Sequence, residues 1–203
     1  MNQKQIKKDI DSIARLDAEV KTALPIVGYP EPRIRPQGFE TLLTTIVSQQ
    51  ISTEAATAVM RRMHELLPSM QASELQKLSP DNLRAAGLSG RKVEYAFGLA
   101  DAIVDGALDT GALSSMDDAQ AIRSITALRG FGDWSAEIYL MFSLQRPDIF
   151  TANDLALQIA LQRLKGLEQR PDEKQTRSLI EHWSPWRSAG SLFLWHYYRG
   201  APT

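Results

Sequence analysis

The sequence predicts an all-α fold, and three observations support that prediction. Apolar residues recur every three or four positions through most of the chain, period-two strand patterns are almost absent, and prolines or glycines separate the periodic segments. The 203 residues are 43% hydrophobic, enough for one substantial core or for two small lobes. No internal repeat, low-complexity tract or flexible linker is visible. We therefore expect a single globular domain over residues 1–203.

The elements follow from where the periodicity starts and stops. One amphipathic helix is expected over residues 3–23, because five apolar residues share its face: Ile6, Ile10, Ile13, Leu16 and Val20. Residues 24–37 contain several prolines and are expected to form a connector. Further helices are expected around 38–48, 53–67, 72–78, 91–106, 117–128, 154–164, 172–183 and 186–199.

A tight glycine turn interrupts this series at residues 128–132. Gly130 and Gly132 flank Phe131, so the backbone can adopt positive φ angles there, and we expect outward-facing amides that a ligand can approach closely. A largely buried helix is expected over residues 133–144, and its positive end joins those amides in a site suited to a phosphate. The alternative is an interhelical turn that needs glycine only for its geometry.

A carboxylate stands at the start of the next helix. Arg146-Pro147-Asp148 ends the preceding helix, and Asn153 and Asp154 open the new one. One residue of that pair suffices as the N-cap, which leaves the other available for chemistry, and the helix dipole favours its ionised form. The alternative is that this pair only caps the helix.

Four motifs together resemble the helix-hairpin-helix (HhH-GPD) DNA glycosylases, and among them the 3-methyladenine DNA glycosylase II branch. The first three are the pattern Leu-x-Gly-x-Gly-x-Trp-Ser-Ala at 128–136, an aspartate 22 residues beyond Gly132, and the pattern Trp-Ser-Pro-Trp-Arg at 183–187. The fourth, residues 39–52, is similar to the family's early helix and the turn that carries its wedge residue. The resemblance extends from about Pro36 to Tyr198.

The resemblance implies two helical lobes with a central cleft, one over 36–146 with the hairpin and the other over 1–35 plus 147–203. It implies a monomeric, monofunctional enzyme of base excision repair that binds double-stranded DNA, flips out a damaged base and hydrolyses its N-glycosidic bond. The expected bases are alkylated purines of the 3-methyladenine and 7-methylguanine type. The alternatives are a glycosylase for hypoxanthine or ethenoadenine, and a non-catalytic lesion-binding protein that keeps the hairpin.

Carried over position by position, the resemblance makes Asp154 the catalytic carboxylate. Trp134 and Trp195 match the aromatic residues that line the family's base pocket. A tryptophan on an apolar helix often belongs to a core instead, and we expect that structural role for Trp183 and Trp186.

The resemblance also assigns contacts to DNA. The hairpin of Gly130, Phe131 and Gly132 matches the phosphate anchor, and Gln50 stands where the family plugs the gap left by the flipped nucleotide. Some relatives carry leucine at the Gln50 position. A structural sodium or potassium ion at carbonyls near Leu128 and Phe131 is compatible with the resemblance, although carbonyl ligands leave no signature in a sequence.

Several absences narrow the chemistry. Bifunctional members of the superfamily form a Schiff base with a lysine in the helix after the hairpin, whereas Trp134 stands at that position and no lysine lies between Leu128 and Asp154. The chain has no cysteine, so the iron–sulfur cluster of other branches is excluded. The three histidines lack metal-ligand spacing, and no other cofactor is expected.

Charge and hydropathy bear on the partners of the chain. The net charge is −1, which argues against a nucleic-acid partner, but residues 101–118 hold five aspartates and no lysine or arginine, and removing those charges leaves +4 on the rest. The first 16 residues are polar, and no apolar run approaches the length of a membrane span. We expect a cytoplasmic protein of bacterial type that has no membrane partner and associates with the nucleoid by binding DNA.

Overall fold

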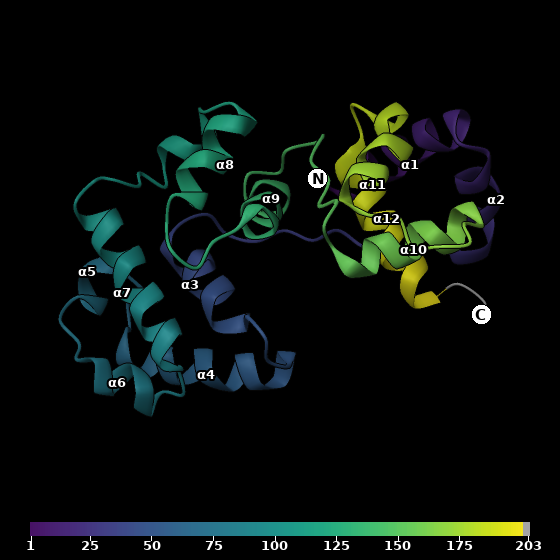
Figure 1. Ribbon diagram of the computed structural model, residues 1–203. Coiled ribbons are helices and arrows are strands. Elements are labelled where there is room, and N and C mark those ends of the chain that lie inside the picture. The colour runs from purple at the N-terminus through teal and green to yellow at the C-terminus, as the bar shows by residue number, and fades with distance from the viewer. Residues whose placement is uncertain (201–203) are drawn as a thin grey trace. The chain divides into compact units, whose positions relative to one another are not determined.

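Helices make up all the regular secondary structure of residues 1–200, the part of the chain that the computed structural model describes (Figure 1). The predicted all-α class is thereby confirmed. The chain forms unit 1, from Met1–Ile34 and the described residues from Leu140 onward, and unit 2, from Arg35–Tyr139. We expected lobes over 36–146 and over 1–35 plus 147–203; the observed change of unit falls inside α9 (Asp133–Phe142). No helix of the described residues is long and apolar enough to cross a membrane.

Unit 2 contains the helices that follow residue 35, up to most of α9. They are α3 (Phe39–Ser48), α4 (Thr53–Leu66), α5 (Ala72–Leu75), α6 (Pro80–Ala85), α7 (Gly90–Val104), the 3-10 helix η1 (Ala112–Ser114) and α8 (Asp118–Thr126). The central helix is α7, which contacts α3, α5 and α6, while α3 also packs on α4 (Figure 1). Leu43 and Ile46 of α3 and Ala96 of α7 are fully buried in its core.

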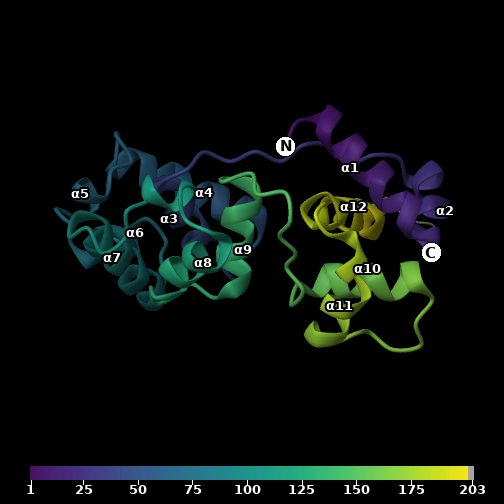
Figure 2. The ribbon, with the colours of Figure 1, turned by 90° about the horizontal axis from the view of Figure 1, so that it is seen from above.

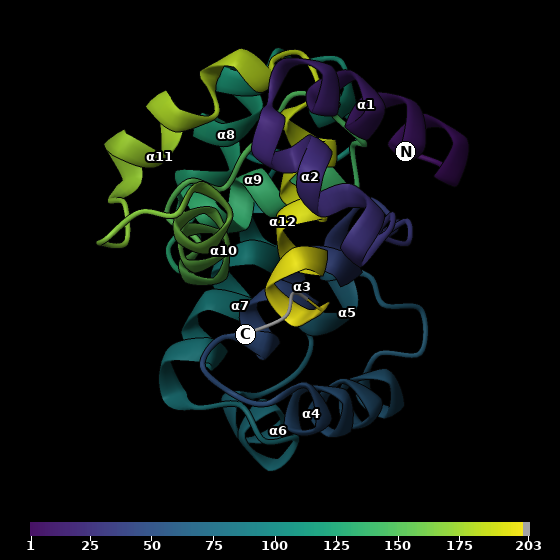
Figure 3. The same cartoon turned by 90° about the vertical axis from the view of Figure 1, so that its right-hand side faces the viewer.

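Unit 1 joins the two ends of the chain. Its helices are α1 (Gln3–Leu16), α2 (Ala18–Val27), α10 (Leu155–Lys165), α11 (Glu173–Leu179), the 3-10 helix η2 (Glu181–Trp183) and α12 (Arg187–Gly200). Figure 2 shows α12 between α10 and the pair α1 and α2, and all three neighbours contact it. The same helices are gathered together when viewed from the side in Figure 3. Buried residues occur all around α12, which is therefore the centre of this unit.

The single helix expected over residues 3–23 is wrong, because the chain breaks at Asp17. Asp17 has extended backbone angles, and its Oδ1 accepts the Val20 amide at 3.2 Å as the N-cap of α2. Its Oδ2 accepts hydrogen bonds from Lys165 Nζ and Trp183 Nε1, both at 2.7 Å. The apolar periodicity continues across the break, so it could not reveal that a buried carboxylate starts a second helix.

Other elements also differ from the expectation; the helix expected over 172–183, for example, divides into α11 and η2. The connector expected at residue 24 starts only at Gly28, because α2 continues through Pro25 to Val27. Pro25 lies in the last turn of α2, where its missing amide removes a single helical hydrogen bond. Sequence periodicity does not predict α6, which buries only Leu83 and begins with a capping box at Ser79.

Replacing Asp17 with asparagine should destabilise the fold by about 3 kcal/mol, because Lys165 and the Trp183 indole lose a fully buried charged acceptor. Burial alone would raise the pKa of Asp17, but the hydrogen bonds from Lys165, Trp183 and Val20 hold it well below its usual range. The difference in unfolding free energy between the wild type and Asp17→Asn should therefore be largest at neutral pH, and it should shrink as the pH falls below the ordinary carboxyl pKa. Urea denaturation at several pH values measures both effects.

The matched control is Glu19→Gln. Glu19 binds the same lysine at 3.0 Å, but its side chain is 48% exposed, so its loss should cost less than about 1 kcal/mol. Equal effects of the two substitutions would contradict the role assigned to the buried carboxylate.

Candidate functional site

The two glycines of the hairpin are not equivalent. Gly130 has a φ of +92°, and a Cβ added there would lie 2.4 Å from Cδ2 of Tyr95. Of the two glycines, only Gly130 uses the positive φ that glycine permits, and nothing lies within 4 Å of the position that a Cβ would take at Gly132. Gly130 is therefore required by the fold, whereas Gly132 leaves open space beside the backbone at the start of α9.

Phe131 anchors the hairpin in unit 2. Its side chain is almost fully buried, and its amide donates to the Leu128 carbonyl at 3.2 Å. The hairpin can thus meet a ligand through its backbone, with the Phe131 ring turned inward. The Leu128 carbonyl keeps a second lone pair, which is compatible with a monovalent cation, and that ion stays a prediction. Among the described residues, no cluster of three or more His, Asp or Glu side chains could hold a metal.

Gln49 links the hairpin to the turn between α3 and α4. Its Nε2 donates to the Gly130 carbonyl at 2.7 Å, across 81 residues of sequence. The same turn is supported by Lys92, whose Nζ donates to the Val47 carbonyl at 2.7 Å, and burial lowers the pKa of this lysine. Sequence reasoning did not identify either role, because the partners are backbone carbonyls far along the chain.

Gln50 occupies the exposed part of that turn. It has a φ of +56°, an uncommon angle for a residue other than glycine. The next residue, Ile51, is an exposed large apolar side chain. A strained, exposed turn with an apolar neighbour is compatible with a wedge, and the role of Gln50 stays a prediction.

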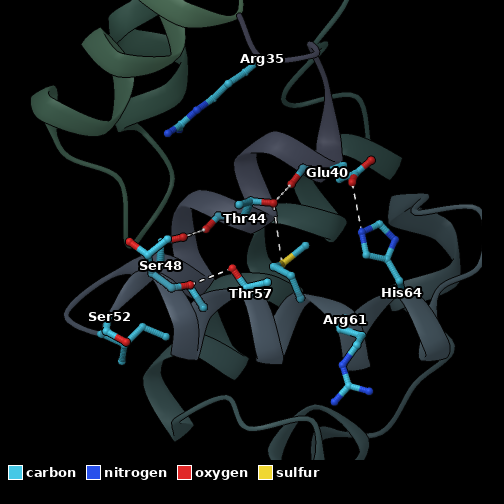
Figure 4. A pocket seen from close by; sticks show the side chains of 12 residues that line it. Arg35, Glu40, Thr44, Ser48, Ser52, Thr57, Arg61 and His64 are labelled. Carbon is cyan, nitrogen blue, oxygen red and sulfur yellow. Dashed lines mark hydrogen bonds and ion pairs between the residues drawn. The ribbon is translucent and has the colours of Figure 1, made fainter. Parts of the chain in front are cut away.

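A groove of about 680 Å³ runs between α3 and α4, beginning at this turn (Figure 4). Thr44 and Ser48 lie along α3, and their hydroxyls donate to carbonyls of their own helix. Figure 4 shows His64 facing Glu40, with Nε2 3.3 Å from the carboxylate. The groove mixes apolar side chains such as Ile51 and Met60 with charged ones such as Arg61. A base pocket is lined mostly by apolar and aromatic side chains, so we do not assign the base to this groove.

Asp154 is itself the N-cap of α10. Its Oδ1 accepts the Leu157 amide at 3.0 Å, while the neighbouring Asn153 is exposed. We expected one residue of the pair Asn153 and Asp154 to cap the helix and the other to be available for chemistry. That expectation is wrong, because Asp154, the candidate catalytic residue, is itself the cap. The same Oδ1 lies 3.4 Å from Nε1 of Trp195, which donates to it. The structure thus brings two of the predicted site residues together within unit 1.

Side chains of unit 1 hold the loop that leads to Asp154. Gln158 Nε2 donates to the Ala152 carbonyl at 2.8 Å, and Arg187 contacts both oxygens of Asp148 at 2.7 Å. Burial alone would raise the pKa of Asp148, but the hydrogen bonds from Arg187 and Ser184 lower it. None of these supporting residues carried a signal in the sequence beyond the Trp-Ser-Pro-Trp-Arg motif.

The four tryptophans differ in burial, and Trp186, for which we expected a structural role, is half-buried. Trp134, on the first turn of α9, is 40% exposed, so the core alternative does not apply to it. Trp195 is 9% exposed; its ring lies 5.8 Å from that of Phe142, and the Arg33 guanidinium lies 5.6 Å from its centroid. Trp183 is fully buried, in agreement with its expected structural role.

The chain is similar to known proteins in both sequence and structure. Residues 43–185 match the model of a family described as "HhH-GPD superfamily base excision DNA repair protein". DNA-3-methyladenine glycosylase 1 of Schizosaccharomyces pombe is 27% identical over 190 residues, which cover 90% of this chain and 83% of that protein. DNA-3-methyladenine glycosylase 2 of Escherichia coli is 26% identical, and the match covers 87% of this chain and 65% of that protein.

A solved structure gives a further match. The 3-methyladenine DNA glycosylase of Schizosaccharomyces pombe in complex with abasic DNA superposes with a TM-score of 0.83 at 26% identity. The match covers 93% of this chain and 95% of that one. The resemblance to the HhH-GPD family and to its 3-methyladenine branch, which rested on motifs, is thereby confirmed.

Replacing Gly130 with alanine should destabilise unit 2 by about 2 kcal/mol or more, because the new Cβ meets both the positive φ and the Tyr95 ring. Gly132→Ala is the matched control and should stay within about 0.5 kcal/mol of the wild type. Thermal melting of both variants measures the difference. Equal losses would mean that the hairpin is not built as described.

Proposed function

The chain belongs to the HhH-GPD superfamily of base excision DNA repair proteins, and on that premise we propose that it is a DNA glycosylase that removes alkylated purines from double-stranded DNA. The expected bases are of the 3-methyladenine and 7-methylguanine type. The observation that carries the proposal is the contact of the Asp154 carboxylate with Nε1 of Trp195, which puts an acid beside an indole.

The base must first leave the duplex. Flipping costs a few kcal/mol, and less when a lesion weakens base pairing. Purines alkylated at N3 or N7 carry positive charge, and a cation is attracted to the electron-rich face of an indole. Trp195 and, by family resemblance, Trp134 supply such faces. The charge of the lesion therefore serves both for recognition and for departure, because a cationic base is a good leaving group.

Asp154 then stabilises the sugar. As the N-glycosidic bond lengthens, the sugar becomes oxocarbenium-like, and a nearby carboxylate attracts that charge, as in glycosidases. At about 4 Å and an effective dielectric constant near 20 the attraction is about 4 kcal/mol, or roughly a thousandfold in rate. The hydrogen bonds of Oδ1 to Leu157 and Trp195 support this role, because they hold the carboxylate in one orientation.

DNA would be gripped through backbone groups of the hairpin. The open space beside Gly132 and the N-terminus of α9 suit a phosphate, and the hydrogen bond from Gln49 to the Gly130 carbonyl supports the hairpin. We propose that Gln50 fills the gap left by the flipped nucleotide. We further propose that the protein acts as a monomer on damaged duplex DNA, in the cytoplasm where a bacterial-type chromosome lies. No cofactor is proposed beyond the structural cation near the hairpin.

Asp154→Asn should abolish release of 7-methylguanine, with the single-turnover rate falling by about a thousandfold or more, while affinity for duplex DNA stays near the wild type. Asparagine caps a helix as well as aspartate does, so stability should be unchanged. Chromatography of the free base measures release. Undiminished release would remove Asp154 from the chemistry.

Two control variants separate chemistry from capping. Asp154→Ala should lose the cap as well, at about 1 kcal/mol, and should show the same loss of release as Asp154→Asn. Asn153→Ala changes the exposed neighbour and should stay active. Wild-type protein that binds lesions but releases no base would instead favour a non-catalytic lesion-binding protein.

We also propose that the enzyme is monofunctional, since Trp134 stands where a lyase would carry lysine. Methylated duplex DNA incubated with the protein should yield free base and intact strands, which break only after hot alkali. Borohydride should trap no protein–DNA adduct. Strand breaks at neutral pH together with a trapped adduct would contradict the proposal.

A further inference from the structure

We infer that the Arg33 guanidinium covers the face of the Trp195 indole in the free protein, and that a flipped base must displace it before the base can stack on that indole. The inference rests on the proposed function, since it concerns the same indole. Its observation is the position of the Arg33 guanidinium, 5.6 Å from the ring centroid and over the ring. Trp195 is only 9% exposed, so its ring has little surface to offer a base in this conformation.

Phe142 and Arg33 both lie against the Trp195 ring, and they differ in burial. Phe142 lies 5.8 Å from the Trp195 ring with the two planes tilted by 41°, and it is almost fully buried in α9. Arg33 is exposed. A buried ring in a close-packed core cannot move without leaving a void, whereas an exposed guanidinium can rotate into water. Arg33 is therefore the group that makes way.

The connector that leads to Arg33 is fastened to helices of unit 1 at two carbonyls. Gln3 Nε2 donates to the carbonyl of Pro30 at 3.2 Å. His196, next to Trp195 on α12, has Nε2 2.6 Å from the Val27 carbonyl. A cavity of about 320 Å³ between residues 30–33 and α12 gives the side chain room to leave the indole while the chain path stays fixed.

The chemistry of the contact makes the competition specific. A guanidinium over an indole is a cation–π contact, the same interaction that a cationic alkylated purine would form with this ring. The two cations repel each other and cannot share the ring at short range. In the free protein the indole already makes a cation–π contact with Arg33. The free energy of base stacking must therefore exceed the free energy lost when that contact breaks.

The test compares full-length Arg33→Gln and Arg33→Lys with the wild type on a duplex that carries one 7-methylguanine, with enzyme in excess. Arg33→Gln should release the base about two- to fivefold faster, the size of an exposed cation–π contact. Arg33→Lys keeps a cation at the position and should stay close to the wild-type rate. Arg170→Gln makes the same charge change at an exposed loop of unit 1 and should have no effect.

A second measurement separates this role from an ordinary contact with DNA. A duplex with an abasic-site analogue has no base to stack, so its affinity should be the same for Arg33→Gln and the wild type. Weaker binding of that duplex would mean that Arg33 contacts a phosphate, and would overturn the inference. Unchanged or slower release by Arg33→Gln would also overturn it. Failure of the wild type to release any alkylated base would instead count against the proposed function.

Discussion

The geometry of the candidate site depends mainly on the two hydrogen bonds that one oxygen of Asp154 accepts. Oδ1 accepts the Leu157 amide as the N-cap of α10 and also meets Nε1 of Trp195. The start of the helix, the carboxylate and the indole therefore have to be placed together. Gln158 and the Arg187–Asp148 pair hold the loop that delivers Asp154 to this position. A carboxylate held by these two hydrogen bonds to Oδ1 needs little reorganisation when charge develops nearby.

The two glycines of the hairpin differ in role: the fold requires Gly130, whereas the open space beside Gly132 is the part of the hairpin that we propose for a phosphate. Gly130 needs its positive φ and leaves no room for a Cβ against Tyr95, so it serves the packing of unit 2. Gly132 has neither requirement, and the space around it is open. Phe131 fills the core between them. A Gly-x-Gly pattern alone could not distinguish these roles, because both glycines are the same letter.

The amphipathic helices could be predicted from the sequence, because a buried helix face produces apolar residues at every third or fourth position. The helices around residues 38–48, 53–67 and 91–106 agree with α3, α4 and α7 within about two residues. The break at Asp17 was missed because it depends on Lys165 and Trp183, more than 140 residues away. Short helices such as α6 were missed because one buried residue makes no stripe.

The sequence by itself determined the all-α class, the family, and the residue types available for chemistry: one aspartate 22 residues beyond Gly132, and a tryptophan where a lyase needs lysine. Only the tertiary structure decided what those residues touch. It made Asp154 both the cap and the neighbour of Trp195, and it placed Arg33 over that indole. The reason is physical: composition and spacing specify local conformation, whereas a carboxylate, an indole and a guanidinium distant in the chain meet only when buried helices pack.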